Sequence, residues 1–427
     1  MSRQCGARLR KTLEPRNDKF SQHLRVLGSA TRSRSCWRGE FPVTAQPRFV
    51  LLLPPVGPLN LQPSSIVILG AGLMGRLLAV ELARQGHTVE VFDSGGPAAE
   101  HAAAPIAAAM VAPLAESAVT EPGVVRMGQY SLTRWPQMLA ALEQPVFFQQ
   151  EGTLIVWHRQ DAAEAHRLQR LLETTQTTIP DLPAMQVLDS AGVAAAEPTL
   201  AHRFTQGLYL PGEGQLDNRQ LLAALAHEMD RLQVRCHWHT PRDPGEFSPG
   251  TPGQADWLLD CRGLGARGQW RDLRGVRGEV VRLHAPEVTL RRPTRVVHPR
   301  YPIYIAPKED HLFVIGATEI ESDDLSPASV RSTLELLSAA YAVHSGFAEA
   351  RIVEIATQCR PTLPDNLPAV RQSQPRVLEV NGLYRHGFMI APAMLDVVLE
   401  IMATGQSPLA SRFDLALPTG DDSRALP

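Results

Sequence analysis

The chain has 427 residues and a formal net charge of −2, so it is long enough for two or three domains and has no general attraction to nucleic acid. Its five cysteines are an odd number without paired spacing, which argues against a disulfide framework and a cysteine-based metal site. The 14 histidines show no HxxxH or HExxH spacing, and no apolar run approaches the length of a membrane span. We therefore expect a cytoplasmic protein without a metal ion and without stable membrane insertion.

Residues 1–63 differ from the rest of the chain. They contain 11 Lys and Arg against 3 Asp and Glu, with scattered Pro and Ser and no clear periodicity. Three interpretations compete: a disordered tail, an organelle-targeting segment, and an upstream extension from a misassigned start codon. We favour a non-globular extension without function, because a nucleotide-binding domain of the kind described next normally begins a few residues before its first strand.

The stretch 65–93, SIVILGAGLMGRLLAVELARQGHTVEVFD, carries the strongest motif. It opens with a continuous apolar run that predicts a buried strand of a parallel sheet. GAGLMG follows, with Gly70 for the tight turn, Gly72 for close approach of a pyrophosphate, and Gly75 for close packing of the next helix on the strand. That helix, a glycine stop and a second strand ending at Asp93 complete the unit.

This order of strand, turn, helix, strand and acid predicts a dinucleotide site, and a βαβ unit whose turn binds nothing is the alternative. The free N–H groups and the positive dipole end of the helix would face the phosphates. Asp93 can accept hydrogen bonds from both hydroxyls of an adenosine ribose, and it would repel a 2′-phosphate, which argues against NADP. The motif alone does not separate NAD from FAD.

Hydrophobic periodicity predicts the other elements. The alanine-rich stretch 102–112 permits close backbone approach, either to a neighbouring element or to the isoalloxazine or pyrophosphate of a cofactor. Helices are predicted at 124–142, at 162–172, after an Asp217 cap, from Ser326–Pro327 with Val330, Leu334, Leu337 and Tyr341 at helical spacing, and at 392–404. Strands are predicted at 89–92, 152–157, 234–238, 256–263, 278–283, 303–306, 312–317 and 377–380.

The chain order of these elements predicts an interrupted nucleotide-binding sheet. The sheet begins near residue 64 and resumes after residue 215, so the stretch between them must form a separate layer. We expect a discontinuous nucleotide-binding domain of residues 64–115, 216–270 and 355–410, a second domain of residues 116–215 and 271–354, and a tail at 411–427.

Four stretches of the chain carry a family resemblance. They are ILGAGLMG…VFD (68–93), AAAMVAP (107–113), YIAPKEDHLFVIGATEIESDD (304–324), and CRPTLPDNLPAV with NGLYRHGFMIAPAML (359–395). Together they resemble the flavin-dependent amino-acid oxidases of the D-amino-acid oxidase class, in particular glycine oxidase of the thiamine pathway. The resemblance covers residues 64–410. It implies an α/β, two-domain fold, with a Rossmann-like FAD-binding domain and an inserted mixed-sheet substrate domain.

The resemblance also implies where FAD binds. The implied contacts are Gly70, Gly72, Leu73, Met74 and Gly75 at the pyrophosphate; Asp93 at the adenosine ribose, with Ser94 beside it; Ala108, Ala109 and Met110 against the flavin; and Gly382, Leu383, Tyr384, Arg385, His386, Gly387, Phe388 and Met389 around the isoalloxazine ring. The last group and the N-terminus of the closing helix would stabilise negative charge on the reduced flavin. Where the family often has Ala-Ala-Gly-Met, this chain has Ala-Ala-Ala-Met (107–110), and the extra methyl group can crowd the flavin.

For the substrate, the resemblance implies contacts with Tyr304, Arg360 and Arg385. An arginine fork matches the two oxygens of an amino-acid carboxylate, and a tyrosine hydroxyl adds a third hydrogen bond without adding charge. With the carboxylate fixed, the α-hydrogen can point at the flavin N5 for hydride transfer, and a neutral amine removes the need for a side-chain base. The structural alternatives are an ion pair of Arg360 with Asp365 and a core position for Tyr304.

Two residues raise separate questions. Glu319 follows Gly-Ala-Thr where glycine-oxidising members have Met, and it lies either near the substrate amine or in solvent beside Glu321 and Asp323. Cys359 stands at about the place where the related sarcosine oxidases bind flavin through a thioether. We expect non-covalent FAD, because the glycine oxidases that share the following Arg-Pro hold their flavin without such a bond.

The resemblance implies an FAD-dependent oxidase of glycine, sarcosine or a small D-amino acid, with molecular oxygen as acceptor and hydrogen peroxide as product. The imine formed would hydrolyse to a 2-oxo acid or supply the thiazole of thiamine. Two alternatives stay open: a D-amino-acid dehydrogenase that passes electrons to a quinone, and a nucleotide-binding protein without catalysis. The oligomeric state is also open and includes a homo-oligomer.

Overall fold

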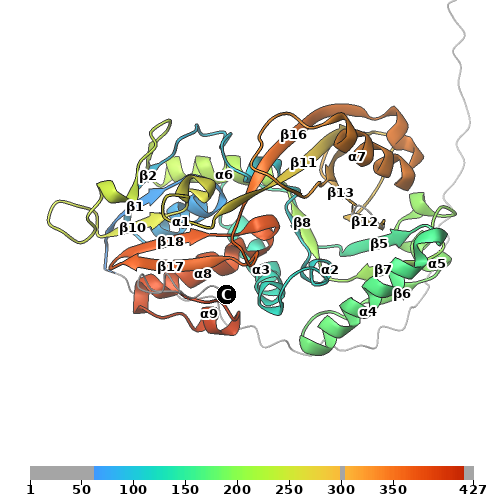
Figure 1. The fold of residues 1–427 in the computed structure, drawn as a ribbon, viewed down its shortest axis with the longest axis horizontal. Coiled ribbons are helices and arrows are strands. Elements are labelled where there is room, and N and C mark those ends of the chain that lie inside the picture. Colours follow the sequence, from blue (N-terminus) through green and yellow to red (C-terminus); the bar gives the residue numbers. More distant parts are fainter. Residues whose placement is uncertain (1–61, 299–302, 418–427) are drawn as a thin grey trace, which may run out of the picture. The chain divides into compact units, whose positions relative to one another are not determined.

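The computed structural model describes residues 62–298 and 303–417 (Figure 1). Of the predicted N-terminal extension, residues 1–61 lie outside the described residues, as do residues 418–427 of the predicted tail. The α/β class predicted from the sequence is confirmed, because three sheets alternate with helices along the chain.

A six-stranded sheet contains the glycine-rich turn. Its order is β17 (Ala369–Gln374), β18 (Val377–Asn381), β10 (Trp257–Asp260), β1 (Ser65–Leu69), β2 (Thr88–Phe92) and β9 (Arg235–His237). Every neighbouring pair is parallel except β17 and β18. Ile66 and Ile68 of β1 belong to the core on one face, while Val67 and Leu69 belong to the core on the other. Burial on both faces explains the continuous apolar run of a parallel strand.

Four helices pack around this sheet: α1 (Leu73–Arg84), α3 (Pro122–Ala140), α6 (Asn218–Arg231) and α8 (Gly387–Thr404). Asp217 caps α6 as predicted, because its side chain accepts hydrogen bonds from the backbone N–H groups of Arg219 and Gln220. Two short helices, α2 (Pro113–Glu116) and α9 (Pro408–Arg412), flank α3 and α8.

The closing helix α8 begins earlier than predicted. It starts at Gly387, so Pro392 lies inside the helix instead of at its start. Proline has no N–H group to donate to the carbonyl of Phe388, and the indole Nε1 of Trp135 donates to that carbonyl at 2.8 Å instead. By length and composition alone, residues Tyr384–Thr404 qualify as a membrane span, which the sequence analysis did not anticipate. This stretch is 78% buried inside the fold, as the core helix of a globular protein would be.

The second large sheet has nine strands and lies to the upper right of the first in Figure 1. Its order is β15 (Ile320–Glu321), β11 (Arg274–His284), β14 (Leu312–Gly316), β13 (Ile303–Pro307), β12 (Thr294–Val297), β5 (Thr153–Trp157), β7 (Gly207–Leu210) and β6 (Gln186–Leu188), and β16 (Arg351–Thr362) also pairs with β11. Three helices pack with this sheet: α4 (Ala162–Thr178), α5 (Ser190–Ala196) and α7 (Val330–Val343). The predicted helix at 162–172 therefore extends to Thr178.

Helix α7 was predicted to start at Ser326–Pro327, which is wrong. Ser329 caps the helix by accepting a hydrogen bond from the N–H of Ser332, and the first helical residue is Val330. Of the apolar side chains predicted for this helix, Val330, Leu334 and Tyr341 are largely exposed, and Leu337 packs against the hydrophobic core of the second sheet. The buried positions are Ser332, Leu336, Ala340 and Val343.

A small three-stranded sheet joins β3 (Met110–Val111), β8 (Gly214–Leu216) and β4 (Phe148–Gln149). It fixes the end of the alanine-rich stretch. The proposed division into two discontinuous domains stays a prediction, and β16 runs across its boundary at residue 355.

Candidate active site

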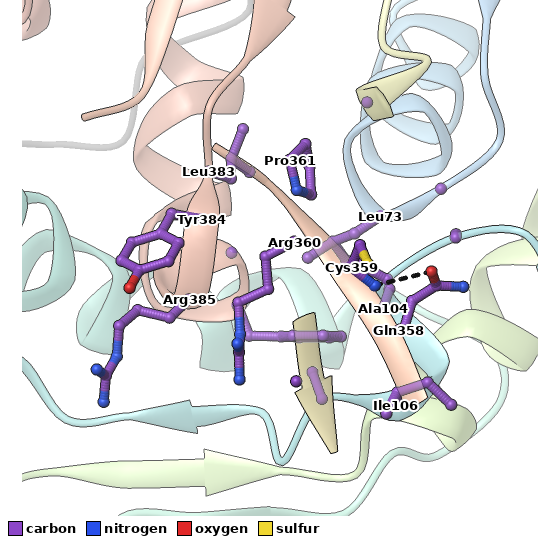
Figure 2. A pocket seen from close by; sticks show the side chains of 18 of the residues that line it. Leu73, Ala104, Ile106, Gln358, Cys359, Arg360, Pro361, Leu383, Tyr384 and Arg385 are labelled. Atoms are coloured by element: carbon purple, nitrogen blue, oxygen red, sulfur yellow. Dashed lines mark hydrogen bonds between the residues drawn. The ribbon is translucent and has the colours of Figure 1, made fainter. Parts of the chain in front are cut away.

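A cavity of about 1150 Å³ extends from the glycine-rich turn after β1 to β16 and the start of α8. Both ends were predicted as site regions from the sequence, although they are almost 300 residues apart in the chain. Figure 2 shows its C-terminal wall, where Arg360 extends from β16 and Arg385 from the segment before α8, in the same direction and with Tyr384 beside Arg385.

The glycine-rich turn has the geometry of a pyrophosphate site. Gly70 has a φ of +92°, which favours glycine, and a Cβ added to Gly75 would lie 1.8 Å from the carbonyl oxygen of Gly70. Gly75 therefore allows α1 to pack against the turn, but it does not line the cavity. Gly72, Leu73 and Met74 do line it, at the N-terminal end of α1, where free N–H groups and the helix dipole favour an anion.

Asp93 and Ser94 line the cavity at the end of β2, the position predicted for the adenosine ribose. The two carboxylate oxygens of Asp93 accept hydrogen bonds from the N–H groups of Ala71 at 2.5 Å and Gly95 at 2.7 Å. These bonds fix the carboxylate beside the turn. Each oxygen keeps further acceptor capacity for a ribose hydroxyl.

The alanine-rich stretch forms the next part of the wall. Ala108, Ala109 and Met110 line the cavity as predicted for flavin contacts. Ala109 has a φ of +52°. The glycine that the family often has here adopts this left-handed conformation freely, whereas alanine pays roughly 1–2 kcal/mol for it. The surrounding structure must therefore hold this loop in place.

The C-terminal segment lines the opposite wall. Its cavity-facing residues are Leu383, Tyr384, Arg385, His386, Gly387, Phe388 and Met389. Gly382 was also predicted as a contact, but it lies behind the wall, packed against Leu367 and Leu363. The segment ends at the N-terminus of α8, whose dipole favours negative charge. Burial lowers the pKa of His386 to about 4, so this imidazole is neutral near pH 7.

Arg360 lies on β16 with its guanidinium group facing the cavity. Within the described residues, its nitrogens donate to three backbone carbonyls, those of Val276 at 3.4 Å, Arg277 at 3.3 Å and Thr318 at 3.2 Å. Gly278 provides the space, since a Cβ added there would lie 2.4 Å from the Nη2 atom of Arg360. No ion pair connects Arg360 to a carboxylate in residues 62–298 or 303–417. The alternative pairing with Asp365 is not formed, and that side chain accepts from the N–H of Leu367 instead. Burial lowers the pKa of Arg360.

Tyr304 lies on β13 and lines the same cavity. Its hydroxyl rests against Gly316 of the neighbouring strand β14, where an added Cβ would be 2.5 Å away. Burial raises the pKa of the Tyr304 phenol, so the hydroxyl stays protonated and can donate a hydrogen bond. The core-tyrosine alternative does not describe this position, because the side chain lines the cavity.

Arg385, predicted as a second substrate contact, is held by two carboxylates. Its Nη1 lies 2.7 Å from Glu319 and its Nε lies 3.1 Å from Glu116. Glu116 also binds Arg295 at 2.5 Å. Burial alone would raise the pKa of the Glu116 carboxyl, but Arg385 and Arg295 hold it well below its usual range. These charges compensate one another, so Arg385 offers less free positive charge than Arg360.

Glu116 and Arg295 line the cavity and were missed from the sequence. Glu116 ends α2 and Arg295 lies on β12, next to Tyr304 in the sheet register. A lone acidic residue after Pro-Leu-Ala and a lone arginine within a strand carry no motif. For both residues, the sequence offered one signal of a functional role, which was an ionisable side chain inside an otherwise apolar segment.

Glu319 was expected either near the substrate amine or in solvent, and it lines the cavity. Its carboxylate accepts hydrogen bonds from the Tyr384 hydroxyl at 2.5 Å and from Arg385. Its neighbours Glu321 and Asp323 pair with other arginines, Arg274 and Arg267. Glu319 is still 48% exposed, which places it at the mouth of the cavity.

Cys359 also lines the cavity, although the residue is buried. Its Sγ donates to the carbonyl of Ser322 at 3.4 Å, and burial raises the pKa of the thiol. In the part of the chain that the structure describes, no group of three or more His, Cys, Asp or Glu side chains is placed to hold a metal ion.

Comparison with known proteins agrees with this geometry. Residues 65–399 match the family described as FAD dependent oxidoreductases. The chain belongs to this family. Its cofactor is therefore FAD, as the family resemblance implied, and the glycine-rich turn, Asp93 and the small-residue wall fit that group.

Individual proteins within this family are also similar to the chain. The chain is 39% identical over 345 residues to the protein named thiamine biosynthesis oxidoreductase ThiO in Rhizobium etli, across 80% of this chain and 97% of the relative. It is 26% identical over 381 residues to glycine oxidase of Geobacillus kaustophilus, across 82% and 95% of the two chains. The crystal structure of that glycine oxidase superposes with a TM-score of 0.70 and 23% identity over 85% of this chain and all of the other, which supports the fold.

Proposed function

We propose that the protein oxidises a small amino acid, such as glycine, sarcosine or a small D-amino acid, to its imine. The chemistry that FAD supplies when bound is acceptance of a hydride from the α-carbon, with the electrons passing on to molecular oxygen to give hydrogen peroxide. Water then hydrolyses the imine to a 2-oxo acid with release of the amine, or the imine is used to form the thiazole of thiamine. The similarity to proteins named ThiO and glycine oxidase supports this choice.

Arg360 carries the proposal. A half-buried cation that lines a cavity, and whose partners among the described residues are backbone carbonyls, is poised for an anion from outside the chain. An amino-acid carboxylate fits, because the guanidinium fork matches its two oxygens and Tyr304 can add a neutral donor. The carboxylate would then replace weak contacts with a charge-assisted pair.

The other charged residues have supporting roles in this proposal. Glu319, at the cavity mouth, would attract the cationic amine of an incoming amino acid. Arg385 is a positioning residue, because Glu116 and Glu319 already occupy its guanidinium group. The FAD is held without a covalent bond, and Cys359 remains a buried thiol.

We propose that the enzyme works in the cytoplasm without nucleic-acid or membrane partners. The three cysteines of the described residues are free thiols, which suits a reducing compartment. Assembly into a homo-oligomer is left open.

Anaerobic mixing of the purified holoprotein with glycine, sarcosine and D-alanine tests the proposal. We expect at least one of them to bleach the visible flavin absorbance, and air to restore the colour with one hydrogen peroxide per imine. Bleaching that a quinone reverses quickly and air reverses slowly would instead identify a dehydrogenase. A flavin that no amino acid bleaches would reject amino-acid oxidation.

A further inference from the structure

Lys308 follows β13 and is the one lysine among the described residues. The residue is 7% exposed, and its Nζ atom donates three hydrogen bonds. The acceptors are the carbonyl of Ala108 at 2.8 Å, the carbonyl of Leu216 at 2.7 Å and the Oε1 atom of Gln215 at 3.1 Å. All three acceptors are neutral oxygens. Burying an ammonium group without an anionic partner costs free energy even when neutral acceptors bind it. We therefore expect this arrangement to have a role in the site.

These acceptors belong to the loop and strand that form the flavin side of the cavity. Ala108 precedes the left-handed Ala109, whose carbonyl accepts from the N–H of Leu216 at 3.0 Å. Met110 pairs with Gln215 between β3 and β8. Lys308 thus ties the second large sheet to the residue before the strained Ala109 and to strand β8, which pairs with Met110. Its own side chain does not line the cavity.

Neighbouring side chains hold the preceding residues in the same manner. The Asn218 amide donates to the carbonyl of Ala104 at 2.8 Å, and Arg282 donates to the carbonyl of Pro105 at 3.3 Å and to Asn218 at 2.9 Å. Side chains outside the cavity therefore donate hydrogen bonds to several backbone carbonyls of the alanine-rich stretch. Of these groups, Lys308 donates to the carbonyl of Ala108, directly before the left-handed Ala109.

We propose that Lys308 is a positioning residue for FAD, whose ammonium group holds the loop of Ala108, Ala109 and Met110 in the conformation against which the cofactor binds. FAD binding is measured without substrate, so an error in the proposed substrate leaves this test unaffected.

Protonation gives the proposal a pH dependence. An ammonium group has three N–H donors for its three oxygens, whereas the neutral amine has two. Burial lowers the pKa of Lys308 to about 7, Asp217 acts to raise it, and Arg282 acts to lower it further. The hold on the loop therefore weakens as the pH rises through this range, and the dissociation constant of FAD should increase with it.

Three variants test the role. Lys308→Met keeps the length of the side chain but removes its donors, and should raise the dissociation constant of FAD roughly tenfold near pH 6, the order expected when buried acceptors lose a donor. Lys308→Arg keeps charge and donors, and should bind FAD more tightly than the methionine variant with little pH dependence. The control is Arg292→Met, since Arg292 is another mostly buried cation that lies away from the cavity, where it pairs with Glu197 and donates to the carbonyls of Glu151 and Ala196. Its FAD affinity should match the wild type.

A second measurement follows Lys308 in the wild-type protein and needs a variant only to assign its signal. The chain has three lysines, Lys11, Lys19 and Lys308, so lysine labelled with ¹³C at Cε gives a simple spectrum in which the Lys308→Arg variant assigns the Lys308 signal. That signal should titrate well below the range of free lysine and shift when FAD is added to the wild-type apoprotein. A Lys308 signal that FAD leaves unchanged would overturn the proposal. So would a Lys308→Met protein that binds FAD within twofold of wild type near both pH 6 and pH 9.

Discussion

At Arg360, the guanidinium group faces the cavity and donates to backbone carbonyls of the described residues. We expect Arg360→Ala to weaken substrate binding by about 2–5 kcal/mol, the usual result of removing one partner from a buried charge pair. Arg360→Lys should recover little, because a point charge cannot reproduce the fork. Binding is measured by anaerobic titration of the flavin spectrum. Arg274→Ala, at a partly exposed arginine that does not line the cavity, is the control, and an unchanged affinity in Arg360→Ala would remove this residue from the substrate site.

Glu319 should control the pH at which the enzyme works. Its carboxylate at the cavity mouth favours the cationic amine, whereas oxidation requires the neutral amine. Glu319→Gln removes that negative charge and leaves Arg385 paired with Glu116 alone, so both changes favour the neutral amine. We expect the kcat/KM profile to shift to lower pH. Glu321→Gln, at a neighbouring acid that does not line the cavity, should leave the profile in place, and the same absence of a shift in Glu319→Gln would place that residue outside the substrate's electrostatic environment.

The sequence identified Arg360 and Tyr304 because each lies in a recognisable motif, but it did not reveal their surroundings. Glu116 and Arg295 form an ion pair across 179 positions of sequence, and no local spacing encodes such a contact. Arg385 was predicted as a free substrate contact for the same reason. Its two carboxylate partners come from separate segments that only the fold brings together.

Individual helices and strands follow local rules where burial is simple. The strand before the glycine turn and the Asp217 cap were predictable because one continuous apolar run and one capping residue determine them. The start of α7 was not, since Pro327 suggested a first turn while Ser329 supplies the cap. Its apolar periodicity was also ambiguous. Two stripes of apolar residues run along the helix, and packing against the second sheet selects the one with Leu336 and Ala340.

Helix α8 shows how a tertiary contact overrides a local signal. Pro392 suggested a helix start, but Trp135 replaces the missing backbone donor at the carbonyl of Phe388. Trp135→Phe should therefore cost about 1–3 kcal/mol for the unpaired carbonyl, in addition to lost packing. Pro392→Ala restores an N–H group to that carbonyl, so the cost of Trp135→Phe should be smaller in the Pro392→Ala background. Urea denaturation of the four proteins measures the coupling, and equal costs in both backgrounds would show that the indole bond does not compensate for the proline.

For the molecule as a whole, the sequence predicts the parallel sheet better than the mixed one. Parallel strands buried on both faces appear as short apolar runs, as at 66–69. The long pairing of β11 with β16 joins residues such as Val276 and Arg360, and their register depends on which face packs against which helix. That register sets the position of Arg360 over Gly278, so the central geometry of the cavity follows from long-range pairing.

The stability of the whole fold should depend on one carboxyl group near the cavity. Glu213 is 2% exposed, its Oε1 atom accepts from the N–H of Ala115 at 2.8 Å, and burial raises its pKa from 4.5 to about 7. Between these two values the folded protein binds more protons than the unfolded chain, so this group makes the free energy of unfolding fall as the pH rises. This decrease in the free energy of unfolding is complete above about pH 7 and has not begun below about pH 4.5.

Glu213→Gln keeps the shape of the side chain but stays neutral at every pH. We expect the variant to be more stable than the wild type near pH 8, by an amount on the order of 3–4 kcal/mol at about 1.4 kcal/mol for each unit of pKa. The difference should shrink towards about pH 5, where the wild-type carboxyl is protonated as well. Urea denaturation of both apoproteins across this range measures it, with Glu143→Gln as the control because that side chain is 60% exposed. Parallel stability curves for Glu213→Gln and the wild type would mean that Glu213 titrates as an ordinary carboxyl group.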